Sequence, residues 1–256
     1  MKVTVLGSGT SHGVPAIGCD CAVCTSSDPK DRRTRPSIYI ESEKARILVD
    51  TSSDLRAQAL ANDIRRVDAI LFTHSHADHV MGLDDVRRFN QIQKSAIPCY
   101  ADAATIAALR QMFAYVFSPP AQIGGGLPQL EPHEITGPWS IADVPIVPIP
   151  LWHGKLPILG FRIGAFAYLT DCNRIPDESW PLLTADGGVR TIILDALRHR
   201  AHSTHFSVTE AIAVVQRLGV ERAYLTHIAH DLGHAATNAQ LPPGVELAYD
   251  GLILTV

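Results

Sequence analysis

The stretch His74–His79 reads HSHADH and places three imidazoles and one carboxylate within six residues, directly after an apolar run. In an extended segment, side-chain direction repeats every two residues, so His74 and His76 point the same way. If the chain turns into a helix near Asp78, that carboxylate and His79 swing toward a second point beside the first. Ligands grouped at this spacing seldom occur without a metal, so the stretch predicts two adjacent metal positions.

Outward from this stretch, one pattern recurs: a short apolar or β-branched run ends in a polar residue. It occurs in VTVLGSGT (3–10) and in five later runs, Ile47–Asp50, Ile70–His74, Ala167–Asp171, Ile192–Asp195 and Tyr224–His227. Runs without clean alternation are typical of strands buried on both faces. Their polar ends predict a site along one sheet edge, where His153, Asp171 and His227 are available as further ligands. Imidazole and carboxylate suit Zn²⁺, Mn²⁺ or Fe, and the sequence does not choose among them.

Helical patterns lie between several of these runs. Ala103–Phe117 carries one apolar stripe, formed by Ile106, Leu109, Phe113, Val116 and Phe117. Ser207 and Glu210 have the spacing of a capping box, which predicts a helix from Ser207 to Gly219. Leu55–Arg66 is a third candidate helix, and residues 118–128, rich in Pro and Gly, are expected to form an irregular loop. Strands mixed with helices predict an α/β protein whose sheets are covered by helices.

The composition sets limits on the class of protein. The 256 residues are 46% hydrophobic and 19% charged, which suits one sizeable core, and we expect a single domain over residues 1–256. The formal net charge of −4 does not favour nucleic acid as a partner. Apolar runs fall far short of the roughly 20 residues that cross a bilayer, and the opening MKVTVLGSG is typical of a strand rather than a signal peptide. We expect a soluble cytoplasmic protein, for which a homodimer is the commonest assembly.

Three of the five cysteines, Cys19, Cys21 and Cys24, lie within six residues. This spacing favours a structural Zn²⁺ in a loop at about 18–25, in a reducing compartment, over a set of disulfides. A closed tetrahedral site needs a fourth ligand, and Cys99 or Cys172 are possible by residue type. Otherwise these two are most simply buried thiols.

The motifs together resemble a known family. HSHADH followed in order by His153, Asp171 and His227 is similar to the metallo-β-lactamase superfamily of metal-dependent hydrolases. The segments GVP (13–15), GCDCAVC (18–24), HGKL (153–156) and THIAH (226–230) resemble more narrowly the phosphodiesterases of the bacterial carbon–phosphorus lyase pathway. The likeness extends over nearly the whole chain. It implies a four-layer αβ/βα sandwich with the site on the shared edge of two sheets.

The resemblance also implies roles for individual residues. One ion would be held by His74, His76 and His153, and the other by Asp78, His79 and His227, with Asp171 bridging the two. His230 would complete the zinc site with Cys19, Cys21 and Cys24. The implied substrates are cyclic phosphodiesters, either 5-phosphoribosyl 1,2-cyclic phosphate or a 2′,3′-cyclic nucleotide.

A two-ion centre suits phosphodiester hydrolysis. Two ions about 3.5 to 4 Å apart share a bridging hydroxide and stabilise charge on the attacking and leaving oxygens. With Asp78 in the metal centre, the candidate proton donor to the leaving group is His205, two residues before the predicted cap at Ser207. Asp50 and Asp195 are expected to orient imidazoles or backbone. Lys155 is expected to be a surface charge. Five scattered histidines are expected to be surface residues or satisfied core groups, namely His12, His133, His199, His202 and His234.

Other functions share this ligand set. A transfer-RNA 3′-processing endonuclease uses the same motif, but the acidic net charge and the lack of an evident basic arm count against it. A thioesterase or lactonase of the superfamily would need a different pocket. A non-catalytic metal-binding accessory protein of cofactor biosynthesis, akin to the pyrroloquinoline quinone pathway protein, is the alternative outside enzymes.

Overall fold

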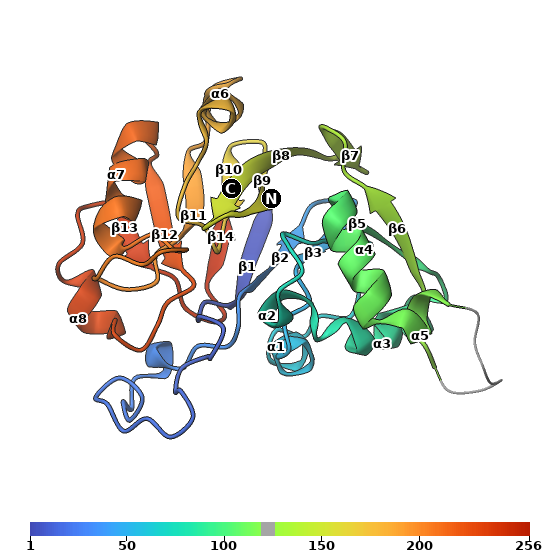
Figure 1. The fold of residues 1–256 in the computed structure, drawn as a ribbon, viewed down its shortest axis with the longest axis horizontal. Helices are drawn as coiled ribbons and strands as arrows, with labels where there is room; N and C mark the ends of the chain where they lie inside the picture. Colours follow the sequence, from blue (N-terminus) through green and yellow to red (C-terminus); the bar gives the residue numbers. More distant parts are fainter. Residues whose placement is uncertain (119–125) are drawn as a thin grey trace.

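The computed structural model describes residues 1–118 and 126–256, and its strands form two seven-stranded sheets (Figure 1). The first sheet has the order β14-β1-β2-β3-β4-β5-β6, with β1 Lys2–Gly7, β2 Ser37–Glu41, β3 Arg46–Val49, β4 Ala69–Leu71, β5 Ile97–Ala101, β6 Leu130–Glu134 and β14 Ile253–Thr255. The second has the order β13-β12-β11-β10-β9-β8-β7, with β7 Trp139–Ile141, β8 Val144–His153, β9 Leu156–Ile163, β10 Phe166–Leu169, β11 Thr191–Asp195, β12 Arg222–Thr226 and β13 Val245–Leu247.

Helices cover the outer face of each sheet (Figure 1). Beside the first sheet lie α1 Leu55–Ala61, α2 Ala77–Val80, α3 Arg87–Gln93, α4 Ala103–Met112 and α5 Ala114–Phe117. Beside the second lie α6 Trp180–Thr184, α7 Val208–Leu218 and α8 His234–Asn238. Short 3-10 helices are η1 Pro29–Asp31, η2 Leu83–Val86 and η3 Asp177–Ser179. The result is the predicted four-layer αβ/βα sandwich.

Three apolar clusters hold these layers together. The central cluster contains side chains from both sheets, such as Val5 and Ile40 from the first and Phe161 and Tyr168 from the second. The other two lie between each sheet and its own helices, and each includes the buried face of a helix, such as Leu109 of α4 or Ala211 of α7. The continuous apolar runs of the inner strands follow from this arrangement, because those strands are covered on both faces.

Parallel pairing places the ends of the apolar runs together. Strands β3, β4, β5 and β6 are parallel, and so are β10, β11, β12 and β13. The carboxyl ends of parallel strands meet at one edge of a sheet, which is the common position of sites in α/β proteins. The residues that follow β3, β4, β10, β11 and β12 therefore gather at one rim of the sandwich.

The structure confirms one predicted helix and corrects two. Helix α7 begins after the Ser207 cap with its capping box formed, and it ends at Gly219, whose φ of 65° favours glycine. The predicted helix Ala103–Phe117 is interrupted at Phe113, where ψ is 45°, although its apolar stripe does face the core. The helix predicted at Leu55–Arg66 ends at Ala61. The backbone and side-chain amides of Asn62 both donate to the Gln58 carbonyl and close the last turn. Most of the expected loop at 118–128 lies outside the described residues.

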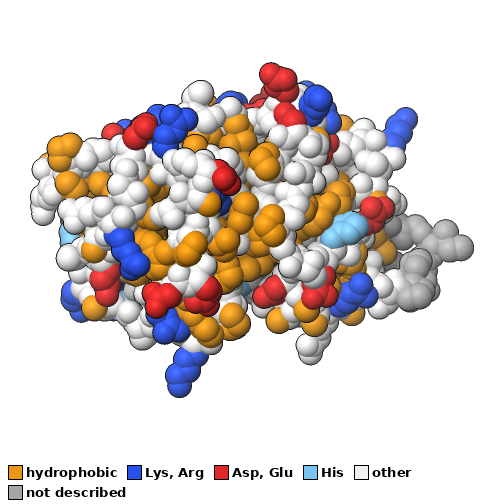
Figure 2. Space-filling view, turned by 90° about the horizontal axis from the view of Figure 1, so that it is seen from above, with side chains coloured by type: hydrophobic (Ala, Val, Ile, Leu, Met, Phe, Trp, Pro, Cys, Tyr) orange, Lys and Arg blue, Asp and Glu red, His pale blue; other side chains and the backbone are white. Residues whose placement is uncertain are grey.

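Figure 2 shows the face at the top of Figure 1, where apolar side chains are interspersed with charges of both signs. A groove of about 640 Å³ lies among residues that include Met1, Glu41, Asp143, Ile163 and Val256. None of the described residues that line it belongs to the predicted site. Across the part of the chain that the structure describes, no helix has both the length and the apolar character needed to cross a membrane.

Candidate metal centre and active site

The HSHADH stretch follows β4 and turns into the short helix α2 at Ala77, which is the turn that the interpretation of two adjacent metal positions requires. His74 follows β4 and is 2% exposed, whereas His76 precedes α2 and is exposed. Asp78 and His79 lie within α2 and are buried. The rings of His74 and His76 are 4.5 Å apart and those of His74 and His79 are 4.2 Å apart. One short segment thus supplies four potential ligands in a compact group.

The second sheet brings Asp171 and His227 against this group. The Asp171 carboxylate lies 3.1 Å from His74 Nε2 and 3.0 Å from His79 Nε2, and His227 Nε2 is 3.5 Å from Asp78 Oδ2. Asp171 and His227 have φ values of 58° and 60°, a left-handed conformation that non-glycine residues rarely adopt. Such strain is held in place by surrounding structure and is frequent at functional sites.

Buried ring nitrogens and carboxylate oxygens at this centre lack hydrogen-bond partners among the described residues. They are His74 Nε2, Asp78 Oδ2, His79 Nε2, Asp171 Oδ1, and both ring nitrogens of His227. The ligand atoms of Asp78, His79, Asp171 and His227 lie within 4.8 Å of one another, and so do those of His74, His76 and Asp171. Buried polar atoms without partners are costly, and a shared cation would satisfy them. The two groups share Asp171, so the residues fit a pair of divalent ions.

His153 lies beside the first group but outside its tight set of ligand atoms. Its ring is 5.1 Å from that of His76, and its Nδ1 is 3.2 Å from Asp171 Oδ1. The same Nδ1 donates a hydrogen bond to the Thr204 carbonyl at 3.0 Å. Nδ1 therefore carries the proton, which leaves Nε2 free as the metal-binding nitrogen.

Electrostatics favours ionised carboxylates at the centre. Burial by itself raises the pKa of Asp171, but His227 and His74 bring it well below its usual range. The pKa of Asp78 is shifted in the same direction. Burial raises it, but His79 and His227 lower it below the ordinary value. The carboxylates are held in the form that binds a cation.

Asp50 and Asp195 orient histidines, as predicted. Asp50 Oδ2 accepts a hydrogen bond from His79 Nδ1 at 2.7 Å, and Asp50 also accepts from the amide and hydroxyl of Thr73. Asp195 accepts from His205 Nδ1 at 3.2 Å and from the Phe206 amide at 2.9 Å. Both carboxylates are fully buried. Each therefore fixes which nitrogen of its histidine carries a proton.

His205 lies in the same rim as the metal centre. It is 8% exposed, and its ring lies 4.8 Å from that of His153 and 4.6 Å from that of His227. Its Nδ1 is also 3.1 Å from Asp171, and Asp171, Asp195, His205 and His227 form a further compact group of potential ligands. The hydrogen bond to Asp195 leaves His205 Nε2 as the nitrogen that can exchange a proton with a substrate. Lys155, read as a surface charge, is exposed.

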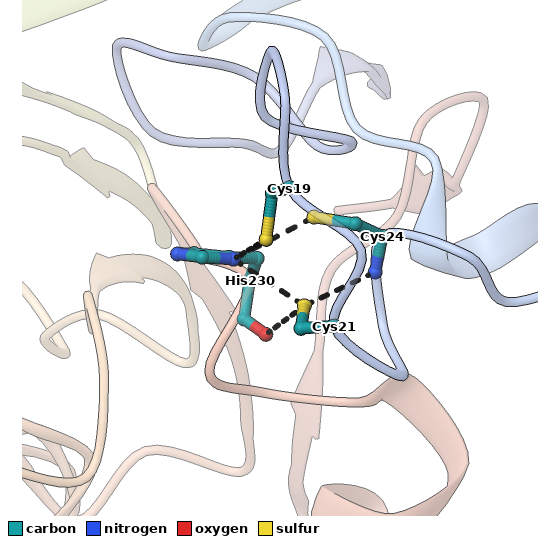
Figure 3. A group of neighbouring side chains, drawn as sticks. All are labelled: Cys19, Cys21, Cys24 and His230. Atoms are coloured by element: carbon teal, nitrogen blue, oxygen red, sulfur yellow. Dashed lines mark hydrogen bonds between the residues drawn. The ribbon is translucent and has the colours of Figure 1, made fainter.

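The cysteine loop forms a second centre with His230 (Figure 3). His230 Nδ1 lies 3.2, 3.4 and 3.5 Å from the sulfur atoms of Cys19, Cys21 and Cys24. A zinc tetrahedron with Zn–S of about 2.3 Å and Zn–N of about 2.0 Å has S–N edges of about 3.5 Å. The four residues therefore fit Zn²⁺. Cys99 and Cys172 are free and buried, as expected of core thiols.

A fully buried arginine, Arg33, connects the two segments of this second centre and was not predicted from the sequence. The Arg33 guanidinium donates to the carbonyls of Ala229 and Leu232, on either side of His230, and to Asp31 at 3.0 Å. Asp31 in turn accepts from the His234 amide. A buried Arg–Asp pair two residues apart has no distinctive sequence pattern, so only the structure reveals it.

The comparison with protein families decides the classification. The family model of the beta-lactamase superfamily domain matches residues 45–228, a range that includes both HSHADH and His227. The chain belongs to the metallo-β-lactamase superfamily. Within it the chain is PhnP-like, because it is 44% identical to the solved structure of a new diphosphatase from the PhnP family. That match has a TM-score of 0.91 and covers 99% of this chain and 96% of the other.

Two curated relatives carry other names. An octanoyltransferase of Porphyromonas gingivalis is 38% identical over 258 residues, a match that covers 98% of this chain and 51% of that protein. A ribonuclease Z of Mycobacterium bovis is 28% identical, with 91% of this chain and 88% of that protein covered. The chain thus spans about half the length of the octanoyltransferase. Relatives of this chain carry very different names, so the family alone does not assign the substrate.

Proposed function

We propose that this metal-dependent hydrolase of the metallo-β-lactamase superfamily cleaves small cyclic phosphodiesters, of the 5-phosphoribosyl 1,2-cyclic phosphate or 2′,3′-cyclic nucleotide type. The proposal rests on one observation: buried ligand atoms from both sheets, which lack hydrogen-bond partners among the described residues, gather around Asp171. The similarity to a PhnP-family diphosphatase supports phosphorus as the atom attacked. A small-molecule substrate is favoured over nucleic acid because the net charge is −4.

Each ligand has a proposed place. His74, His76 and His153 would hold one ion, Asp78, His79 and His227 the other, and Asp171 both. When bound, the two ions activate a water molecule and neutralise charge on the phosphate oxygens. Mn²⁺ and Zn²⁺ both suit these donors, with Fe as the further option, and Zn²⁺ suits the cysteine centre.

The chain's own residues handle the leaving group. Asp195 holds the Nδ1 proton of His205, so the imidazole presents Nε2 to the substrate. Protonated His205 Nε2 would donate its proton to the departing sugar oxygen and so avoid a free alkoxide. Asp50 keeps His79 fixed through Nδ1 and leaves Nε2 for the ion.

The test is hydrolysis of bis(p-nitrophenyl) phosphate and 2′,3′-cyclic nucleotides by protein loaded with Mn²⁺ or Zn²⁺. We expect turnover in the wild type and none in Asp78→Ala or His79→Ala, with the cysteine-bound metal retained in both. Asp85→Ala is the matched control, because Asp85 lies nearby in η2 and outside the ligand groups. Retained activity in the ligand variants would refute the assignment, and absence of turnover in the wild type would favour a binding protein.

Diphosphate hydrolysis is the second candidate, and the named activity of the 44% identical PhnP-family structure favours it. The same two-ion centre suits a phosphoanhydride, whose leaving phosphate needs less help from a proton donor than a sugar alkoxide does. Nucleoside diphosphate compounds therefore belong in the substrate panel. An octanoyl thioester belongs there too, because of the Porphyromonas gingivalis relative. The preferred substrate is the one with the highest kcat/KM.

A further inference from the structure

His202 lies next to His205 at the same rim but belongs to none of the metal-ligand groups. We propose that His202 is a substrate-binding residue whose Nε2–H donates a hydrogen bond to a phosphate oxygen. This inference rests on the proposed function in that it assumes a phosphorylated substrate at the centre. It differs from the prediction from sequence, in which His202 is a surface residue or a satisfied core histidine.

His202 lies at one end of a row of four imidazole rings. Ring centroids are 5.1 Å apart between His76 and His153, 4.8 Å between His153 and His205, and 5.1 Å between His205 and His202. Exposure varies along the row, since His205 is buried and His202 is half-buried. His202 is thus the more accessible neighbour of buried His205, and a ligand that contacts His205 would have His202 within reach.

The tautomer of His202 is fixed by its own loop. The Thr204 backbone amide lies 3.3 Å from His202 Nδ1, and the Thr204 hydroxyl lies 3.2 Å from it. A backbone amide can only donate, so Nδ1 accepts and the ring proton resides on Nε2. Burial and the neighbouring His205 lower the pKa of His202, which is consistent with a neutral ring. His202 is therefore a hydrogen-bond donor through Nε2.

The two neighbouring histidines have opposite hydrogen-bonding roles. His205 Nδ1 donates to Asp195, so Nε2 is the nitrogen at which His205 gains or loses a proton. Neutral His202 carries its proton on Nε2. One ring is thus suited to exchange a proton with the leaving group, and the other to contact an anionic oxygen that needs a donor.

The loop that carries His202 is held in place by local hydrogen bonds. Asn173 accepts from the Gly154 amide at 2.8 Å and donates to the Ser203 carbonyl at 2.9 Å. The Arg198 guanidinium donates to the carbonyls of Arg200 and Ala201. A donor fixed before the ligand arrives contributes more to binding than one on a loose loop.

The experiment measures binding of inorganic phosphate to the metal-loaded protein by calorimetry, together with KM and kcat for bis(p-nitrophenyl) phosphate. His202→Phe removes the donor, whereas His202→Gln places an amide N–H near the position of Nε2. His199→Phe is the matched control, since His199 is an exposed histidine of the same loop. Circular dichroism and the zinc content of the cysteine centre verify that each variant folds.

We expect His202→Phe to weaken phosphate binding and raise KM by about tenfold, as for loss of a hydrogen bond to a charged group, with a smaller change in kcat. His202→Gln should recover most of the loss, and His199→Phe should match the wild type. Equal phosphate affinity in His202→Phe and His199→Phe would overturn the inference, as would a wild type that binds no phosphate. Weakened phosphate binding without wild-type phosphodiester turnover would support the contact and reject the proposed substrate.

Discussion

Asp50 and Asp195 both lie at a strand end, one in each sheet, but orient histidines of different roles. Asp50 follows β3 of the first sheet, Asp195 ends β11 of the second, and each is a fully buried carboxylate that accepts a hydrogen bond from a histidine Nδ1. The partner of Asp50 is His79, a proposed metal ligand, whereas the partner of Asp195 is His205, the proposed proton donor. A buried carboxylate at a strand end can thus orient an imidazole either for metal binding or for proton transfer.

The largest effect should come from Asp171, whose carboxylate belongs to both proposed metal positions. Asp171→Ala removes the carboxylate shared by the two groups of ligand atoms. We expect kcat to fall by about 1,000-fold or more, because the charge stabilisation of a two-ion centre is lost. Elemental analysis should show loss of the active-site ions alone. Retention of both ions in this variant would contradict the bridging role.

Asp50→Asn tests the carboxylate that orients the proposed metal ligand His79. The amide cannot accept all the hydrogen bonds of the carboxylate, so His79 loses its orientation and its basicity falls. We expect metal affinity to fall 10- to 100-fold, as is typical for such partners of ligating histidines, with activity restored by excess metal. A competition assay with a chelator measures the affinity.

Asp195→Asn tests the carboxylate that orients the proposed proton donor His205. Here we expect kcat to fall about 10-fold or more, since His205 loses the partner that fixes its tautomer, with less change in metal content than in Asp50→Asn. Excess metal should not restore the activity. If both variants respond alike to added metal, the distinction between the two carboxylates is wrong.

The cysteine centre contains no carboxylate, and here the contrast lies between the pKa values of two thiols. The Cys24 amide donates to the Cys21 sulfur, which lowers the pKa of Cys21 to about 6, whereas burial raises the pKa of Cys24 to about 11. In metal-free protein, one thiol should therefore become reactive toward iodoacetamide as the pH rises through about 6. Mass spectrometry should place the label on Cys21 rather than Cys24, and Zn²⁺ should suppress it.

The smallest effect should come from the cap of α7, which follows His205 directly in the chain. Ser207→Ala removes the capping box, and we expect the free energy of unfolding to fall by about 1 kcal/mol. Urea denaturation measures this difference. On the side of the first sheet, α2 has no side-chain cap at His76, so His76→Ala should not produce a loss of this kind.

Much of the site could be predicted from sequence because its residues follow strands. HSHADH, Asp171 and His227 each end an apolar run, and parallel strands must bring such ends to one edge. Asp50 and Asp195 were identified by the same logic. The interruption at Phe113 and the early end of α1 were not predicted, because local backbone hydrogen bonds rather than apolar periodicity decide where a helix stops.

The sequence by itself determined the chemistry available: imidazoles and carboxylates at strand ends, three thiols in a short loop, and a capping box before α7. Tertiary structure decided which of these groups meet and which proton each carries. Thr204 is an ordinary residue in the sequence, yet its carbonyl accepts from His153 and its amide donates to His202. Arg33 likewise gains its role only when Ala229 and Leu232 fold over it. The physical reason is that hydrogen-bond partners, burial and strain depend on distances between segments remote in the chain, and those distances exist only in the folded protein.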